Sequence, residues 1–301
     1  MNNNPNIKEK SKTSPYHKEN EQISESLEEI TKKLAIIMRI RGPRMTVTQR
    51  SKFVKQPRGG HIKRIDFDEI SLGAGEEELN EYENVHASLM GMAVDYLTRY
   101  IITGDKDEAF KISILGSKTI NKIRTANKLL KGISGLDDES IANAIKLTGF
   151  DVLYRAGKMG YVPVKQIKPD KNTIENTRIM VQRTINFFEK YGPVIKEGFT
   201  FEGAYTKVIA TGDADYLTAD ILRDLKVLKN YITKNHTLQL FIYWRMGLRS
   251  DYQTFKKIKK LGIYNPRKNK VFTYDLAKLS NETIRIVDEE VIGYTKPMAI
   301  Y

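Results

Sequence analysis

Three residues in the second half of the chain have types and spacing that could do chemistry: Asp215, Asp224 and Lys226. Asp224 and Lys226 lie two positions apart in the apolar segment 221–227, which has the composition of a β-strand. Residues two apart on a strand point to the same face, so this carboxylate and this ammonium group should lie side by side. Asp215 begins a second strand-like segment, 215–218, and a neighbouring strand would bring its carboxylate close to that of Asp224.

Two carboxylates on adjacent strands can share a hard divalent cation. Mg²⁺ accepts oxygen ligands and keeps waters for a phosphate substrate. The neighbouring lysine can orient or help to deprotonate an attacking water and can neutralise charge in the transition state, while the metal polarises the scissile phosphate. The pattern therefore predicts a site for Mg²⁺ (or Mn²⁺) at Asp215 and Asp224, with Lys226 as the catalytic lysine.

A predicted helix, roughly 236–248, follows these strands and carries a third polar motif. Gln239 and Tyr243 stand four residues apart in it. A hairpin is predicted after the helix, at 258–274, with its turn at 265–269. In chain order, the three motifs are Gly-x-x-Asp at 212–215, Asp-x-Lys at 224–226 and Gln-x-x-x-Tyr at 239–243.

This order of motifs resembles the PD-(D/E)XK nucleases, in particular their RecB-like branch, which includes relatives of lambda exonuclease. The resemblance covers residues 199–275 and implies a restriction-endonuclease-like core that hydrolyses DNA phosphodiesters with Mg²⁺. It implies that Gln239 and Tyr243 line the site and contact the substrate backbone. It also implies a further metal ligand on an upstream helix, and His86, in Val-His-Ala-Ser-Leu with Glu83 one turn away, fits that context. Such relatives act in phage, mobile-element or repair metabolism, and the resemblance does not distinguish an exonuclease from an endonuclease.

Each motif also has a purely structural interpretation. An Asp-x-Lys in a strand is commonly a surface ion pair, and a single histidine at a helix start, such as His86, is commonly a capping residue. Asp213 would be the ligand in place of Asp215 if the strand register differed, although an Asp at a turn usually caps its own backbone. Two other classes of function therefore stay open. One is a non-catalytic nucleic-acid- or protein-binding module on a degenerate nuclease fold, and the other is a structural phage component in which the carboxylates only form ion pairs.

The charge of the chain favours a polyanionic partner. Its formal net charge is +13 and its pI is near 9.5, and clustered Lys and Arg gain free energy by releasing counterions from a phosphate backbone. Segment 31–64 holds eleven Lys or Arg and no acidic residue, whereas 65–83 holds eight Asp or Glu and no basic residue. We expect DNA as the partner, contacted by Arg41, Arg44, Arg50, Arg58, Lys229, Arg245 and Arg249. A solvated basic face is the alternative.

The pattern of elements predicts an α/β (α+β) fold with a small mixed central sheet flanked by helices and a mostly helical N-terminal half. Apolar residues at helical spacing predict helices at 84–103, within 108–133, at 140–148 and at 173–191. The predicted strands are 199–210, 215–218 and 221–227, and the basic stretch 45–60 is predicted to be an extended arm.

Four regions follow from these elements. They are a disordered tail (1–22), a helix with the basic arm and an acidic linker (23–83), a mostly helical region that contributes to the core (84–192), and the nuclease-type core with a C-terminal extension (193–301). The mostly helical region could thus complete a site whose motifs all lie downstream of it.

Composition excludes several kinds of site. The chain has 301 residues, 40% apolar content, which is ample for a core, and no cysteine. Disulfides, thiolate metal sites, iron–sulfur clusters and cysteine nucleophiles are therefore excluded, and the lack of cysteine fits a reducing compartment. The first thirty residues are polar, and no run approaches eighteen consecutive apolar residues. We expect a soluble, cytoplasmic protein with no membrane partner, and self-association into a homo-oligomer stays open.

Overall fold

The structure, a computed structural model, describes residues 44–73, 77–158 and 160–295. From Met45 onward these residues belong to one compact unit. The predicted tail, the predicted helix after residue 23 and Arg41 lie outside the described residues. Within the described part of the chain, no helix combines the length and the apolar character needed to cross a membrane.

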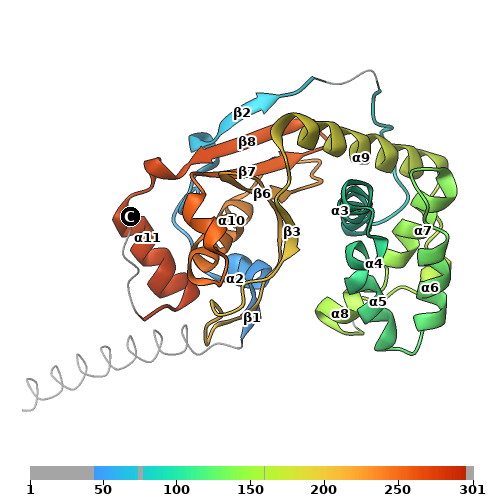
Figure 1. Cartoon of the computed structure of the whole chain (residues 1–301), viewed down its shortest axis with the longest axis horizontal. Helices are drawn as coiled ribbons and strands as arrows, with labels where there is room; N and C mark the ends of the chain where they lie inside the picture. The colour runs from blue at the N-terminus through green and yellow to red at the C-terminus, as the bar shows by residue number, and fades with distance from the viewer. Residues whose placement is uncertain (1–43, 74–76, 159, 296–301) are drawn as a thin grey trace, which may run out of the picture. The chain divides into compact units, whose positions relative to one another are not determined.

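A six-stranded mixed β-sheet runs through this unit in the order β2-β8-β7-β6-β5-β3 (Figure 1). Its strands are β2 (Asp68–Ser71), β3 (Lys196–Phe199), β5 (Ala214–Leu217), β6 (Ile221–Leu225), β7 (Lys260–Asn265) and β8 (Lys270–Asp275). All neighbours are antiparallel except β6 and β7, which run parallel. Parallel neighbours need a crossover connection, and α10 (Lys234–Arg249) provides it.

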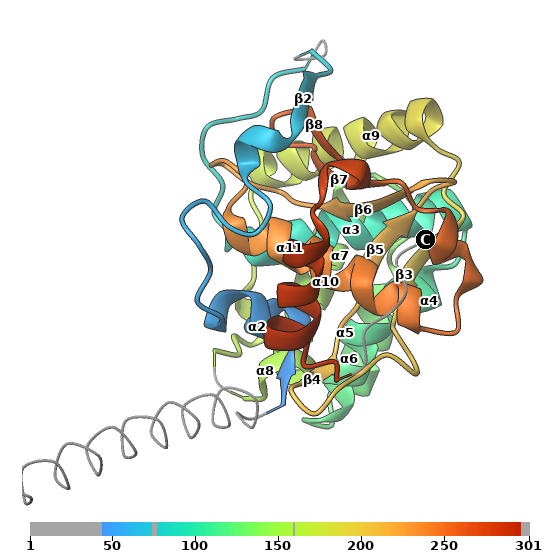
Figure 2. The same ribbon diagram turned by 90° about the vertical axis from the view of Figure 1, so that its left-hand side faces the viewer.

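Helices cover both faces of the sheet. One group consists of α3 (Ala87–Thr103), α4 (Lys106–Ala109), α5 (Lys111–Lys118), α6 (Ile123–Lys131), α7 (Asp138–Thr148), α8 (Asp151–Ala156) and α9 (Lys171–Tyr191). The other consists of α2 (Val47–Phe53), α10 and α11 (Asn281–Ile286). In Figure 2, α10 and α11 lie nearer the viewer than α3 and α7. The predicted α/β (α+β) class, a small mixed sheet flanked by helices, is therefore confirmed.

Side chains that alternate along the central strands separate two apolar clusters. Ile263 and Phe272 point into the cluster that contains α10, whereas Tyr264 and Val271, one position along, point into the cluster that contains α3 and α9. The predicted helical region, 84–192, thus packs directly on the sheet of the downstream region, on the face opposite α10.

The predicted extended arm at 45–60 is wrong. Met45–Thr46 forms β1, which pairs in parallel with β4 (Ile209–Thr211), and the helix α2 begins directly after it. The Thr46 side chain accepts a hydrogen bond from the backbone N–H of Gln49, whose side chain bonds back to the Thr46 N–H, so a capping box starts the helix. Val47 is fully buried and α2 packs against α10. Burial against α10 explains why a basic segment forms a helix here.

The predicted strand at 199–210 is also wrong in its extent. β3 ends at Phe199, and the chain then turns through Gly203, whose φ is +81°. Tyr205 closes the turn, because its hydroxyl accepts from the N–H of Phe201 and donates to the carbonyl of Gly212. Beyond β3, Phe201 is buried in the core and Tyr205 packs against it without belonging to a strand, which explains the strand-like pattern.

Candidate active site

Strands β5 and β6 bring two carboxylates face to face. Their antiparallel ladder pairs Tyr216 with Arg223, and one residue further in the same register Asp215 comes opposite Asp224. Side chains directly opposite on such a pair have Cβ atoms about 5 Å apart. The Oδ2 atom of Asp215 accepts a hydrogen bond of 2.8 Å from the backbone N–H of Leu225, which fixes this carboxylate at the end of the ladder.

Lys226 completes the predicted trio. Its Nζ atom lies 2.6 Å from Oδ2 of Asp224, and the Asp224 side chain is only 2% exposed. Burial raises the pKa of Asp224. The ammonium of Lys226 opposes this rise, and the neighbouring carboxylate of Asp215 adds to it. Burial would lower the pKa of Lys226, but Asp224 and Asp215 outweigh burial and raise it, so the lysine is an ammonium ion.

Helix α3 presents an Asp–Arg pair to the same place. Nη2 of Arg99 lies 3.5 Å from Oδ1 of Asp215 and 2.8 Å from Oδ2 of Asp95, one turn earlier on the helix. The hydroxyl of Tyr216 donates to Oδ1 of Asp95 at 2.8 Å. Burial raises the pKa of Asp95, Arg99 opposes the rise, and Asp215 reinforces it. The sequence prediction missed both residues, although a charged i,i+4 pair inside the broad apolar face of α3 was a usable signal.

Gln239 and Tyr243, on α10, lie beside the carboxylates. Nε2 of Gln239 donates to the hydroxyl of Tyr243 at 2.9 Å and to Oγ1 of Thr48 at 3.0 Å. Burial raises the pKa of Tyr243 well above its ordinary value, and the carboxylates of Asp213 and Asp224 raise it further. The two predicted helix residues therefore form one buried hydrogen-bonded pair, and Tyr243 lies within electrostatic range of the carboxylates.

Gly212 is required where the chain enters β5. A Cβ atom at this position would lie 2.6 Å from Cγ2 of Val47 and 3.2 Å from Cε1 of Tyr243. The absence of a side chain lets the turn before Asp215 approach α2 and α10 closely. The glycine of the Gly-x-x-Asp motif thus sets the distance between β5 and the helix that carries Tyr243.

Asp213, the alternative ligand in the sequence, has a partner of its own. Its Oδ2 atom lies 3.2 Å from Nη2 of Arg155 on α8, and both side chains are partly exposed. Burial tends to raise the pKa of Asp213, but Arg155 outweighs it and the net shift is downward. Arg155 also lies 3.7 Å from the buried Asp151. Asp213 therefore links the edge of the site to the helical region.

His86 is placed away from the carboxylates. It is the N-cap of α3, where its Nδ1 atom accepts a hydrogen bond from the N–H of Ser88, and its side chain is exposed. Arg99, which reaches Asp215, lies roughly 20 Å further along the same helix at 1.5 Å per residue. The structure therefore does not bring His86 to Asp215 as the predicted metal ligand, and it supports the capping interpretation.

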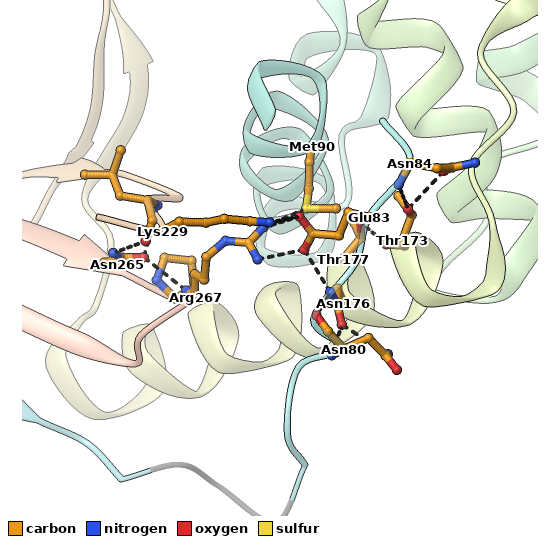
Figure 3. Close-up of polar contacts among 12 residues, drawn as sticks. Asn80, Glu83, Asn84, Met90, Thr173, Asn176, Thr177, Lys229, Asn265 and Arg267 are labelled. Carbon is orange, nitrogen blue, oxygen red and sulfur yellow. Dashed lines mark hydrogen bonds and ion pairs between the residues drawn. The ribbon is translucent and has the colours of Figure 1, made fainter. Parts of the chain in front are cut away.

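Glu83 belongs to a separate buried cluster (Figure 3). Its carboxylate lies 2.7 Å from Nη1 of Arg267 and accepts hydrogen bonds from Nη2 of Arg267 at 2.9 Å and from the amide of Asn176 at 2.8 Å. Lys229 approaches it at 3.7 Å and is 60% exposed. Glu83 thus ties the segment before α3 to α9 and to the β7–β8 turn, and these contacts account for its burial.

A side chain that binds nucleic acid must be exposed to solvent, and Arg50 is buried. It is 4% exposed, and its guanidinium donates to the carbonyls of Val291 at 2.7 Å and Glu290 at 2.9 Å. The predicted role of Arg50 in binding DNA is therefore wrong. Arg44, Arg58 and Lys229, in contrast, are exposed.

Arg245 and Arg249 are also structural. Nε and Nη2 of Arg245 donate to the two carboxylate oxygens of Asp288 at 2.8 and 2.7 Å, and Nη2 of Arg249 lies 3.0 Å from the same carboxylate. The guanidinium of Arg249 also lies 3.9 Å from the centre of the Tyr294 ring. These interactions hold the C-terminal segment on α10, so the predicted DNA contacts at Arg245 and Arg249 are corrected.

The residues around Asp224 fit a hard divalent cation. Oδ2 of Asp224 is buried and, apart from its ion pair with Lys226, accepts no hydrogen bond of normal geometry from the part of the chain that the structure describes. Its raised pKa reports the cost of two neighbouring carboxylates in a site withdrawn from water. Among the described residues, no three Asp, Glu or His side chains form a ready group of metal ligands. Mg²⁺, however, commonly binds through one or two protein carboxylates, with waters and substrate phosphates as its other ligands.

The site thus combines two facing carboxylates, an ammonium group, an arginine and a buried Gln–Tyr pair. Such a set can bind a cation and a phosphate next to each other and can stabilise negative charge. In comparisons with known proteins, no family matches the chain, and neither a curated protein nor a solved structure is found to be similar to it. The function of this site must therefore be inferred from the positions of its own side chains.

Proposed function

We propose that the protein is a Mg²⁺-dependent deoxyribonuclease that hydrolyses phosphodiester bonds. One observation carries the proposal: the β5–β6 register, continued by one residue, sets Asp215 opposite Asp224, and the ammonium of Lys226 lies 2.6 Å from Asp224. In this proposal Asp215 and Asp224 hold the ion. When bound, the ion polarises the scissile phosphate and offsets charge on its oxygens.

Lys226 acts as a charge-stabilising group. Its pKa is raised, so it stays protonated beside Asp224 and Asp215 at neutral pH. An ammonium ion stabilises the negative charge that builds up on the phosphate oxygens and can orient the attacking water by donating to it. Of the two roles that the sequence left open for this lysine, its ion pair with Asp224 favours charge stabilisation over proton abstraction.

The surrounding residues keep the carboxylates in position. Arg99 contacts Asp215 and Asp95, and the Leu225 N–H holds the other oxygen of Asp215. The Gln239–Tyr243 pair is buried, so we assign it a bracing role behind the carboxylates. This differs from the direct contact with the substrate backbone that the resemblance implied.

A second candidate function is a non-catalytic binding module. It is favoured by the fact that each carboxylate already has a cation beside it, Arg99 for Asp215 and Lys226 for Asp224. In such a module the acids would form ion pairs only. Binding of DNA would then depend strongly on salt and would be indifferent to chelators.

Cleavage assays separate the two functions. Purified protein is incubated with linear and circular DNA, single- and double-stranded, in the presence of Mg²⁺, Mn²⁺ or EDTA. We expect cleavage with either metal and none with EDTA. Lys226→Met and Asp215→Asn should each reduce the rate at least a hundredfold without unfolding the protein, as measured by thermal denaturation. Cleavage that persists in both folded variants would exclude this site, and DNA binding without cleavage would favour the binding module.

A further inference from the structure

A basic and aromatic surface follows the candidate active site along the chain. The loop between β6 and α10 leaves the site at Lys226 and reaches the surface at Tyr231, whose side chain is 57% exposed. The guanidinium of Arg64 lies 4.3 Å from the centre of the Tyr231 ring, and the ammonium of Lys268 lies 4.6 Å from it. We call Arg64, Tyr231 and Lys268 the Tyr231 platform. Three separate segments of the chain contribute to it.

The loop that carries Tyr231 is anchored on both sides. The amide of Asn265, at the end of β7, donates to the carbonyl of Leu228 at 2.9 Å and accepts from its N–H at 3.3 Å. On the other side, Ile232 is buried in the apolar core. The exposed ring therefore stands on a fixed stretch of chain. Tyr231 is five positions after Lys226, so the two residues are at most roughly 17 Å apart.

Further cations lie near the platform along the chain. Lys229, in the same loop, is 60% exposed and approaches Glu83 only at 3.7 Å. Arg64 has Glu69 at 4.0 Å, a distance at which an exposed ion pair contributes little. Lys234, at the start of α10, lies beside Gly60, which precedes Arg64 by four positions. A phosphate arriving here meets several cations that are not fully neutralised.

An exposed aromatic ring with flanking cations suits an unpaired nucleotide. Proteins that bind single strands combine cationic side chains, which follow the phosphates, with aromatic rings, on which bases stack. A cation above an exposed ring is held weakly, so a base can replace it while the cation moves to a phosphate. In a duplex the base faces are stacked on each other and are closed to such a ring.

We propose that the Tyr231 platform binds an unpaired nucleotide of a DNA strand that continues into the candidate active site. The base stacks on Tyr231, and Arg64 and Lys268 contact the phosphates on either side of it. This inference deepens the proposed function and rests on it, because the bound strand is the substrate. It makes single-stranded DNA, or the frayed end of a duplex, the preferred substrate.

Binding is measured by fluorescence anisotropy with a labelled thymidine oligonucleotide and with a duplex of the same length, in EDTA so that no strand is cut. We expect Tyr231→Ala to weaken single-strand binding roughly 5- to 150-fold, as is usual for loss of one stacked base, and to change duplex binding far less. Tyr231→Trp should retain the affinity. Arg64→Ala and Lys268→Ala should each lower the slope of log affinity against log salt by roughly 0.7.

Tyr82→Ala is the matched control, because Tyr82 is also exposed, at 73%, but is flanked in sequence by Glu81 and Glu83. It should leave both affinities unchanged. No loss in Tyr231→Ala, or an equal loss for single strand and duplex, would overturn the platform. Cleavage by the unchanged protein is assayed separately with Mg²⁺. If the platform binds single-stranded DNA but the protein cleaves none, the proposed nuclease function fails and the binding site stands. If the protein cleaves DNA but Tyr231→Ala does not change binding, the binding site fails and the nuclease function stands.

Discussion

The guanidinium of Arg99 lies 3.5 Å from the carboxylate of Asp215, which joins the helical region to strand β5 at the candidate active site. Arg99 also holds Asp95, so one side chain bridges two buried acids. The centre is therefore not confined to the segment that carries its motifs. Residues of α3 take part in the candidate active site, so substitutions in the helical region should alter the positions of its carboxylates.

Replacing Arg99 by methionine should lower the free energy of unfolding by about 3 kcal/mol, because it leaves Asp95 and Asp215 without their shared cation. The measurement is urea denaturation at neutral pH. Arg285→Met is the matched control, since its ion pair with Glu289 is about half exposed and should contribute less than about 1 kcal/mol. Equal losses in the two variants would show that Arg99 has no special role in holding the acids.

Arg245→Met should destabilise the fold by about 3 kcal/mol, because it breaks a bidentate buried pair with Asp288. Affinity for DNA, measured on the protein that remains folded, should not change. Arg58→Met, at an exposed arginine, should leave stability unaltered and provides the comparison. A variant at Arg245 that stays fully stable but binds DNA less tightly would restore the role predicted from the sequence.

His236 should make stability depend on pH below neutrality. Burial, with smaller contributions from Lys226 and Lys52, lowers its pKa from 6.5 to about 4. Between these values the unfolded chain binds more protons than the folded one, so the free energy of unfolding falls as the pH drops through this window. The full contribution is on the order of 1 to 3 kcal/mol.

The His236→Gln variant should therefore lose less stability than the unchanged protein between pH 6.5 and pH 4 in urea titrations. Burial lowers the pKa of His61 as well, so in His236→Gln the slope of the free energy of unfolding against pH should decrease without vanishing. His86→Gln, at an exposed histidine, controls for loss of an imidazole. An unchanged slope in His236→Gln would contradict the assignment.

Gly212→Ala should lower the thermal midpoint and slow cleavage together. The new Cβ would meet Val47 at 2.6 Å and push β5 away from Tyr243, at a cost of about 1 to 3 kcal/mol. Gly135→Ala, where nothing lies within 4 Å, should be neutral. A stable Gly212→Ala protein with normal activity would show that the close approach is not needed.

Local patterns were enough to predict the strand and helix positions of the central motifs. Asp224 lies in β6 with Lys226 one residue beyond its end, and Gln239 and Tyr243 lie on α10. Each position depends on a short segment with a clear period. Asp215 opposite Asp224 follows from a simple antiparallel register. These parts of the site require no knowledge of distant contacts.

Long-range burial explains what the sequence could not reveal. A basic side chain that binds phosphate and one that is buried against protein oxygens look the same in the sequence. Arg50 and Arg245 were therefore predicted to bind DNA although both are buried. The contribution of Arg99 depends on how α3 packs across the sheet, which no local pattern encodes. The extended arm was mispredicted for the same reason, since α2 is stabilised by its contact with α10.

The C-terminal contacts of Arg50 and Arg245 also have a consequence for how the protein is made. Both arginines depend on residues 288–291, which a ribosome synthesises after every strand of the sheet and after α10. Until that segment emerges, α10 would bury the charge of Arg245 without its partner, which is strongly unfavourable. We therefore expect the helix that braces the candidate centre to settle only after residues 288–291 have left the ribosome, so that a nascent chain without them carries no working site.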